Sequence, residues 1–381
     1  MNGANACPRV VQKFIGAYGK WRLPEKFGIR LIQRFIFVGS ILLLCVGNNS
    51  EALADDRSGS PARAKTMRAW ALSLDNDLFV PLSSSDRDYT GGIALTYSGD
   101  GGSVIRRPFD YLQGAMDQLL GAPKHKATTT SMEVGTYGFT PDDIQSADVL
   151  ASDRPYASLV YISSSRMYAL SANRSISTSL TWGVLGTHLF GELQRRLHRA
   201  VGNQPIHGWH HQISDGGELT GRYQIAHHKY WQADDFRSRI KTTVFSSVGY
   251  LTELGAALST RRGLISSPDH RFNPELIAYG ERVNDIVTAP YQGEESYFWG
   301  GISFKVRLYN AFLQGQFRHS AHTLRYRDLR PVIGEAWLGY TFTIGQHYRA
   351  SYVVRAHTSE IRSGAGNRHH IWGGFVFSRY F

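Results

Sequence analysis

Cysteine is almost missing from this chain, which contains only Cys7 and Cys45 in 381 residues. Both cysteines lie in the first 54 residues, and we interpret this segment below as a cleaved leader. A mature chain that begins at residue 55 therefore has no thiol. This excludes a disulfide scaffold, a thiolate metal site and a cysteine nucleophile.

Long apolar runs are also missing after the leader. No stretch there has the roughly 18 consecutive apolar residues that a membrane-spanning helix requires. A Gly-x-Ser-x-Gly elbow is absent as well, so a serine hydrolase of that type has no support. The sequence excludes helical membrane spans in the mature chain and leaves other hydrolytic chemistry open.

Charge is sparse, because Asp, Glu, Lys and Arg make up only 19% of the residues, while aromatics reach 12% and glycine occurs 39 times. This composition suits an all-β protein with tight turns and an aromatic surface. The formal net charge of +11 is partly due to the first 54 residues, which carry seven basic and two acidic side chains. The excess that remains, about +6, is too modest to indicate a nucleic-acid partner.

The first 54 residues have the pattern of a bacterial export signal. A basic lead is followed by an apolar run over residues 35–46 and then by Ala52-Leu53-Ala54. We therefore predict a signal peptide over residues 1–54 that is cleaved after Ala54, with a retained anchor or a misassigned start as the alternative. Cys45 does not follow the small residue that a lipoprotein signal needs, so we predict no lipidation.

Residues 55–381 alternate between apolar and polar side chains with a period of two. Three such runs lie in residues 176–184, 304–308 and 336–344, and the last strand, residues 371–381, ends on Phe381. An aromatic end with Phe375 on the same face is typical of bacterial outer-membrane barrels. We predict an antiparallel transmembrane β-barrel of about twelve strands, and the alternative is a soluble sandwich.

One segment departs from this strand pattern. Residues 189–201, followed by Gly202, predict a short helix that ends at the glycine. Gln194 and His198 are four residues apart and would share one side of this helix. A helix between strands can simply cap a barrel rim, but these two polar side chains make it a candidate functional element.

Four sequence pieces together resemble the lipid A 3′-O-deacylase family of outer-membrane enzymes. They are Asn76-Asp77, Asp86-Arg87-x-Tyr89-Thr90-Gly91-Gly92, Asp153-Arg154-Pro155-Tyr156-Ala157, and Gly191-Glu192-x-Gln194-x-x-x-His198-x-x-x-Gly202 with Gly208-Trp209-x-x-Gln212. A fifth piece, Ser259-x-Arg261-Arg262-Gly263-Leu264-Ile265, is also similar. The match extends over essentially the whole mature chain.

The resemblance implies removal of the 3′-linked acyloxyacyl group from lipid A, with calcium dependence. It implies a site at the outer-leaflet end, between the barrel wall and a helix in an extracellular loop. By position, Asn76, Asp77, Thr90, Gln194 and His198 match the family's active-site residues. The family's lysine before the second Arg-containing motif has no counterpart, since no basic residue lies between Met132 and Asp153.

The chemistry of these side chains is compatible with ester hydrolysis. His198 has an intrinsic pKa suited to accepting a proton from water near neutral pH. Asp77 could bind a hard cation or orient the imidazole, and Asn76 and Thr90 fit the same oxygen-rich cation shell or an oxyanion site. We favour water attack assisted by Ca²⁺. Arg106 and Arg107 are candidates for binding lipid A phosphates, or else mark a polar rim.

Two other functions remain open at this stage. An outer-membrane phospholipase would share the fold and the ester chemistry, and a porin or adhesion barrel would have no catalytic role. The main hypothesis expects lipopolysaccharide as substrate, contact with outer-membrane lipids, and assembly through the C-terminal strand by the barrel assembly machinery. It expects a monomer and no nucleic-acid partner.

Overall fold

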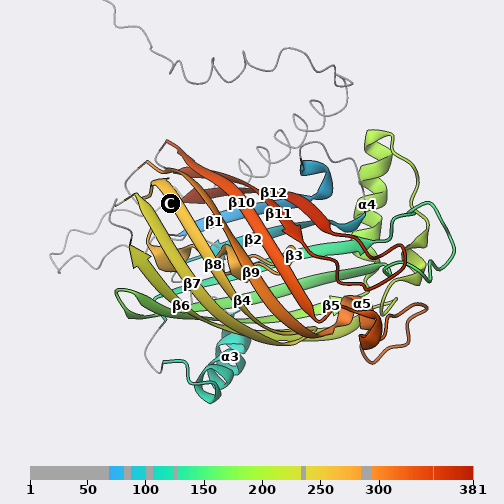
Figure 1. Cartoon of the computed structure of the whole chain (residues 1–381), viewed down its shortest axis with the longest axis horizontal. Coiled ribbons are helices and arrows are strands. Elements are labelled where there is room, and N and C mark those ends of the chain that lie inside the picture. The colour runs from blue at the N-terminus through green and yellow to red at the C-terminus, as the bar shows by residue number, and fades with distance from the viewer. Residues whose placement is uncertain are drawn as a thin grey trace, which may run out of the picture. The chain divides into compact units, whose positions relative to one another are not determined.

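The computed structural model describes residues 68–80, 87–99, 106–123, 127–232, 237–284, 294–345 and 347–380. Within these residues, twelve antiparallel strands close into a barrel in which each strand pairs with its sequence neighbours and β1 pairs with β12 (Figure 1). The predicted fold is therefore confirmed. The leader lies outside the described residues, as do Asp86 and Phe381, so its cleavage remains a prediction.

The strands are 8 to 15 residues long. They are β1 (Ala69–Asn76), β2 (Asp88–Ser98), β3 (Thr129–Thr140), β4 (Ala157–Ser171), β5 (Arg174–Leu185), β6 (Glu218–Gln232), β7 (Ser238–Gly249), β8 (Leu251–Leu264), β9 (Ser296–Asn310), β10 (Val332–Ile344), β11 (Tyr348–His357) and β12 (His370–Tyr380). Because consecutive strands run in opposite directions, the connections fall at two ends. We call the end where β1 finishes the loop end, and the other the terminus end.

Short helices lie in the connections at both ends, and the first group is at the loop end. This group contains η1 (Asp77–Phe79), α4 (His188–Val201), η3 (Gly208–His211), α5 (Ala311–Gln314) and η6 (Tyr326–Asp328). The connections at the terminus end contain α3 (Arg107–Leu119), η4 (Asp269–Arg271) and η5 (Pro274–Leu276). Among the described residues, no helix is both long enough and apolar enough to cross a membrane.

Successive side chains of each strand point alternately into the lumen and to the outer wall, which explains the period of two in the sequence. On β10, for example, Leu338 and Ile344 are exposed on the outer wall, whereas Glu335 and Thr341 are buried on the lumen side. The barrel therefore has an apolar exterior and a polar interior.

A segment that the sequence pattern did not predict fills the lumen. We call residues 265–284, in the connection from β8 to β9, the plug. Glu275 of the plug pairs with Lys241 at 2.7 Å, and Arg282 pairs with Asp75 at 2.5 Å. Glu281 lies 3.2 Å from Arg222 of the wall. Buried charges are tolerated only when paired, so the lumen-facing charges of the strands hold the plug in place.

Helix α3 lies on the outside of the wall, near the terminus end. Its Gln113 donates a hydrogen bond to the Thr178 hydroxyl at 3.1 Å. Thr178 alternates along β5 with Ser179 and Thr181, whose hydroxyls bond plug residues inside the lumen. Thr178 therefore faces outward. This helix was not predicted, and it explains why the outward residues near Thr178 are buried while Trp182, further along β5, is 44% exposed.

Candidate active site

The floor of the candidate site is a row of small or polar residues on the outer wall at the loop end. Asn76 is the last residue of β1 and alternates with Asp75, which pairs with the plug, so Asn76 faces outward. In register, Asn76 pairs with Gly91 of β2, and Gly91 pairs with Gly138 of β3. Neighbouring strands are about 4.8 Å apart, so Asn76 and Gly138 lie roughly 10 Å apart with little side-chain bulk between them.

Thr90 sits at a bulge beside this floor. The register of β2 against β3 shifts between Tyr89 and Gly91, which leaves Thr90 as the extra residue. Its hydroxyl lies 2.6 Å from the hydroxyl of Thr140, and both threonines are buried. Bulges commonly re-aim a side chain next to an active site. Here the bulge places two hydroxyl groups above the glycine row.

Asn76 and Asp77 hold the turn that follows β1. The Asn76 side chain accepts a hydrogen bond from the Leu78 N–H at 2.8 Å and donates one to the Thr90 carbonyl oxygen at 2.8 Å. Asp77 is almost fully buried, and its Oδ2 accepts a hydrogen bond from the Arg87 N–H at 2.8 Å. The pair therefore connects the end of β1 to the start of β2 and fixes a carboxylate at the rim.

Helix α4 has the predicted position and the predicted end. It spans His188–Val201, and Gly202 terminates it with a φ of 77°, a left-handed conformation that favours glycine. Its buried residues are Phe190, Gly191, Gln194 and His198, while Leu189 and Leu193 are exposed. Gln194 and His198 do share one side, as predicted, and that side faces the protein.

Contacts with the wall fix the position of α4. The helix lies against β3 and β4. An added Cβ on Gly138 would come within 2.4 Å of the Phe190 ring, so this ring lies directly on the floor. Gly138 faces outward because its neighbours Tyr137 and Phe139 belong to the aromatic core inside the barrel. The Ser158 hydroxyl of β4 donates to the Thr187 carbonyl oxygen at 3.1 Å, which anchors the start of the helix.

The rest of the α4 connection packs behind the helix. Tyr156, Phe190, Ile206 and Trp209 form one buried apolar cluster. The Trp209 indole N–H donates to Gln194 Oε1 at 2.9 Å. The Asp153–Ala157 piece and the Gly208-Trp209 piece of the family resemblance therefore support the helix, and this packing holds the Gln194 carboxamide in one orientation.

The geometry of His198 defines its tautomer. Nδ1 lies 3.0 Å from the carbonyl oxygen of Gln204, in the same connection. Because a carbonyl oxygen only accepts, Nδ1 carries the proton in this bond, and the neutral ring then has its lone pair on Nε2. A buried imidazole oriented in this way has the arrangement of a general base.

The exposed side of α4 carries two arginines besides Leu189 and Leu193. Glu192 accepts hydrogen bonds from Arg196 at 2.8 Å and Arg195 at 3.0 Å. These bonds, that from Arg196 first, lower the pKa of the Glu192 carboxyl below its ordinary value. The two guanidinium groups give the exposed face of the helix a positive potential next to the floor, which suits an anionic substrate.

The five predicted catalytic residues come to the same end of the barrel, but the two predicted phosphate-binding residues do not. Arg106 and Arg107 stand at the start of α3, in the connection from β2 to β3 at the terminus end. Arg106 donates to Asp110 at 3.2 Å and is largely buried. Arg106 and Arg107 therefore lie at the opposite end of the barrel from His198, and their binding to lipid A phosphates stays a prediction.

The predicted metal ligands form an oxygen-only set whose chemistry fits Ca²⁺. Asp77 offers a buried carboxylate, Thr90 a hydroxyl and a carbonyl, and Asn76 a carboxamide oxygen. Hard cations such as Ca²⁺ prefer such ligands and take six to eight of them. Because Asn76 Oδ1 already accepts from Leu78, the chain supplies only part of that number.

Sequence reasoning missed several residues of the site. Gly138 and Thr140 complete the floor, and Gln204 sets the tautomer of His198. A glycine within a strand can signal a close approach by another element, so Gly138 carried a readable signal. Gln204 carried none, since its contribution is a backbone carbonyl. Lys124 and Lys126, the basic residues closest to the family's lysine position, lie outside the described residues.

Three comparisons place the chain among known proteins. The family model described as "Outer membrane protein LpxR" matches residues 37–381. The structure of LpxR from Salmonella typhimurium is similar, with a TM-score of 0.62 and 18% identity, covering 82% of this chain and 100% of that chain. An outer membrane channel from Pseudomonas putida F1 gives a TM-score of 0.42 at 7% identity, over 87% of this chain and 100% of that one. No curated protein matches.

The closed barrel with an apolar exterior defines an outer-membrane β-barrel protein. Within that class, the match over residues 37–381 shows that the chain belongs to the outer membrane protein LpxR family. The likeness to the Salmonella structure supports the same fold.

Proposed function

We propose that this protein hydrolyses the ester bond of the 3′-linked acyloxyacyl chain of lipid A, in the outer leaflet of the outer membrane. The observation that carries this proposal is the placement of His198 on the wall-facing side of α4, at the end of the barrel that also holds Asn76, Asp77 and Thr90. Family membership supports it independently. The site opens on the outer wall, where a lipid can reach it without entering the lumen.

In the proposed reaction, the Nε2 lone pair of His198 accepts a proton from a water molecule. The water oxygen attacks the ester carbonyl carbon, the bond to the sugar oxygen breaks, and His198 returns the proton to that oxygen. The products are a free fatty acid and a 3′-hydroxyl group. The Gln204 carbonyl keeps the imidazole in the required tautomer, and the packing of Trp209 keeps Gln194 oriented beside it.

The floor contributes binding and orientation. In this proposal an acyl chain lies against the wall beside Asn76 and α4, where Gly91 and Gly138 add no side chains of their own. Asp77, with Thr90 and Asn76, would hold the calcium ion that the family implies, and when bound this ion polarises the ester carbonyl. The bonds that Asn76 makes to Leu78 and Thr90 keep this set at the rim.

The plug argues against the alternative of a conducting porin. Its ion pairs with Lys241, Asp75 and Arg222 occupy the lumen. A phospholipase would use the same ester chemistry, so the two hydrolase functions are separated by their products.

The decisive experiment is mass spectrometry of lipid A and phospholipids from cells expressing the wild-type chain, His198→Ala or Asp77→Ala. We expect the wild type to release the 3′ chains and both variants to retain them, with all three barrels assembled in the outer membrane. Unchanged 3′ deacylation in either variant would remove that residue from the mechanism. Loss of phospholipid chains with intact lipid A would identify a phospholipase instead.

A further inference from the structure

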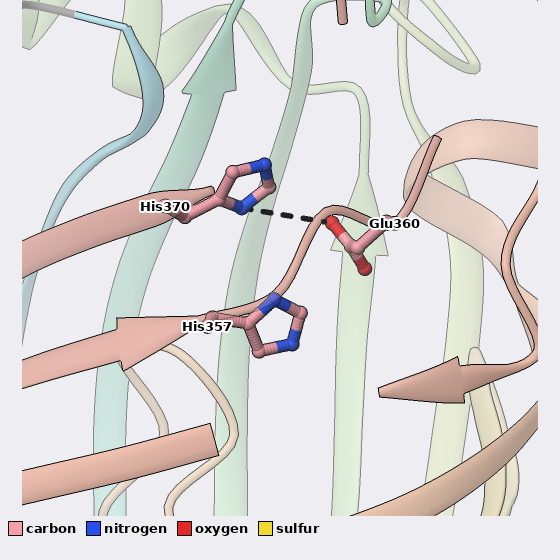
Figure 2. A group of neighbouring side chains, drawn as sticks. All are labelled: His357, Glu360 and His370. Carbon is pink, nitrogen blue, oxygen red and sulfur yellow. Dashed lines mark ion pairs between the residues drawn. The ribbon is translucent and has the colours of Figure 1, made fainter. Parts of the chain in front are cut away.

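A second cluster of ionisable side chains lies in the lumen and takes no part in the proposed hydrolysis. His357 ends β11, His370 begins β12, and the two are cross-strand partners. Glu360 lies in the short connection between them, three residues after His357. One potential ligand atom from each of the three side chains lies within 4.8 Å of the other two. Figure 2 shows the two rings and the carboxylate gathered at one point inside the barrel.

His357 is the member of this cluster that most needs an explanation. It is only 3% exposed, and neither of its ring nitrogens has a hydrogen-bond partner among the described residues. A polar group buried without a partner costs free energy, and most such groups in folded proteins are paired. An imidazole cannot avoid this cost by changing tautomer, because one nitrogen donates and the other accepts in either form.

His370 is oriented as a metal-binding histidine is. Its Nε2 lies 3.5 Å from Asp88 Oδ1, and its Nδ1 lies 3.9 Å from Glu360 Oε2 (Figure 2). When Nε2–H faces the Asp88 carboxylate, the lone pair is on Nδ1 and points toward Glu360. This is the carboxylate–histidine arrangement that fixes the tautomer of metal-ligating histidines.

Glu360 is held so that one oxygen faces the two histidines. Its Oε1 accepts hydrogen bonds from the Tyr279 hydroxyl at 2.7 Å, from Asn310 Nδ2 at 3.0 Å and from Arg307. Its Oε2 has no hydrogen-bond partner among the described residues, and the nearest cation to it is Arg154, at 3.7 Å. The carboxylate is thus fixed by one oxygen and presents the other.

We propose that His357, Glu360 and His370 form a binding site for a divalent transition-metal ion of the Zn²⁺ type. Two imidazoles and one carboxylate are a ligand set that Zn²⁺ takes in proteins with a fourth position left to water. Metal–ligand bonds of about 2.1 Å in a tetrahedral site place ligand atoms about 3.4 Å apart. Rotation of the side chains by roughly an ångström therefore closes the site.

The surrounding charges permit a cation. The ion pairs that connect to Glu360 and Asp88 join four carboxylates, of Asp88, Asp153, Glu253 and Glu360, to three guanidinium groups, of Arg154, Arg307 and Arg368. This connected network has one negative charge in excess when both histidines are neutral. The neighbouring Lys305–Glu335–Arg355 group carries one positive charge in excess, so the ion depends on the imidazole ligands as well as on charge.

Such an ion would join the end of β11, the start of β12 and the connection between them. The ligands belong to the lumen, whereas the proposed hydrolytic site is on the outer wall, so the two sites are separate. We expect the ion to stabilise the barrel and to leave ester hydrolysis largely intact when it is removed. Failure of this inference would therefore say nothing against the deacylase.

The test uses the full chain folded in detergent micelles and freed of metal with a chelator. Co²⁺ serves as a spectroscopic probe, and Zn²⁺ is titrated in competition. We expect one Co²⁺ per barrel with the strong visible absorption of a four-coordinate ion, and displacement by Zn²⁺. His357→Gln and His370→Gln should each weaken binding about 100-fold or more, and Asp88→Asn about tenfold to 100-fold, the range typical of residues that orient a metal ligand.

The matched control is the double variant His210→Gln with His211→Gln, which removes a neighbouring pair of histidines from the α4 connection at the loop end. It should bind Co²⁺ as the wild type does. Absence of saturable binding by the wild type, or loss of binding in this control with retention in His357→Gln, would overturn the proposal. If a glutamine variant does not fold, anomalous diffraction from wild-type crystals soaked in Zn²⁺ decides, because a peak away from His357 and His370 also overturns it.

Discussion

Helices α3 and α4 lie against the outer wall near opposite ends of the barrel, and both are reversed relative to a helix of a water-soluble protein. The exposed side of α3 carries Tyr111 at 80% and Leu119 at 84% exposure, and that of α4 carries Leu189 and Leu193. Their protein-facing sides carry polar residues. A soluble protein would bury the apolar side, so this reversal is what a lipid surrounding selects.

The two helices differ in what their polar residues contact. On α3, Asp117 receives hydrogen bonds from Arg166 at 2.9 Å, from Tyr168 at 2.8 Å and from Tyr223 at 2.8 Å, all from the outer wall. Gln113 bonds Thr178 in the same way. The polar side of α3 is therefore bonded to the strands that it covers, and this helix acts as a structural brace.

On α4, hydrogen bonds join two polar residues to the helix's own connection. Gln194 accepts from Trp209, and His198 donates to the Gln204 carbonyl. The wall below is glycine and threonine, with Phe190 on Gly138. The same reversed pattern thus serves a structural brace at one end and, in the proposed function, the hydrolytic site at the other. The two helices cover different parts of the wall, with large polar side chains under α3 and glycine and threonine under α4.

The largest expected difference comes from removing one buried polar side chain from each helix. His198→Ala should lower the deacylation rate by about 10²- to 10⁴-fold, the usual contribution of a general base, with little change in stability. Gln113→Ala should leave the rate unchanged and lower the free energy of unfolding by about 1–2 kcal/mol, since it removes buried hydrogen bonds. Rates on lipid A and urea unfolding in micelles measure the two effects. Equal losses of activity in the two variants would contradict the different roles assigned to α3 and α4.

The second prediction concerns Asp117, the buried carboxylate that joins α3 to the wall. Asp117→Ala leaves Arg166 next to two tyrosines without its buried carboxylate partner, so we expect a loss of about 3 kcal/mol of stability, the low end for breaking a buried pair. Activity per folded barrel should remain. The measurement is the denaturant midpoint together with activity normalised to folded protein.

Asp110→Ala is the matched control for Asp117→Ala. Asp110 also pairs with Arg166, at 2.8 Å, but its side chain is 45% exposed, so its loss should cost less than about 1 kcal/mol. A larger cost for Asp110→Ala than for Asp117→Ala would contradict the assignment of Asp117 as the buried anchor.

The third prediction tests whether α4 needs a position without a side chain in the wall beneath it. A side chain at Gly138 would overlap the Phe190 ring, so Gly138→Val should displace α4 and lower activity by at least about tenfold while the barrel still assembles. Misplacement of a catalytic group by about an ångström can cost as much as 10²-fold. Thr178→Val, the near-isosteric change under α3, should leave activity unchanged. A fully active Gly138→Val would mean that α4 does not need this contact.

Much of this comparison could be predicted from the sequence, and the reasons are local. Period-two alternation in residues 336–344 reports directly which side chains meet lipid. Gly202 marks the end of α4, and the spacing of Gln194 and His198 puts them on one side. Each of these signals is carried by the residues themselves and needs no knowledge of distant contacts.

The features that could not be predicted depend on contacts between distant parts of the chain. The plug is a connection whose charges make sense only with their partners on the strands, such as Arg282 with Asp75. Helix α3 was overlooked, and it lacks the glycine C-cap that marks the end of α4. The distance between Arg106 and His198 could not be predicted for a related reason, since the basic charge of Arg106 does not tell at which end of the barrel it lies.

The smallest expected effect concerns the apolar sides that α3 and α4 turn outward. A single aspartate placed near a membrane interface costs at most about 1 kcal/mol, so Leu119→Asp and Leu193→Asp should both destabilise the barrel slightly in liposomes and hardly at all in micelles. Only Leu193→Asp should also reduce activity, by a few fold, because α4 borders the path of the acyl chain and α3 lies at the other end. Kinetics on lipid A in liposomes measure this. An equal or larger activity loss for Leu119→Asp would show that substrate reaches the protein near α3. It would contradict the assignment of α3 as a structural brace.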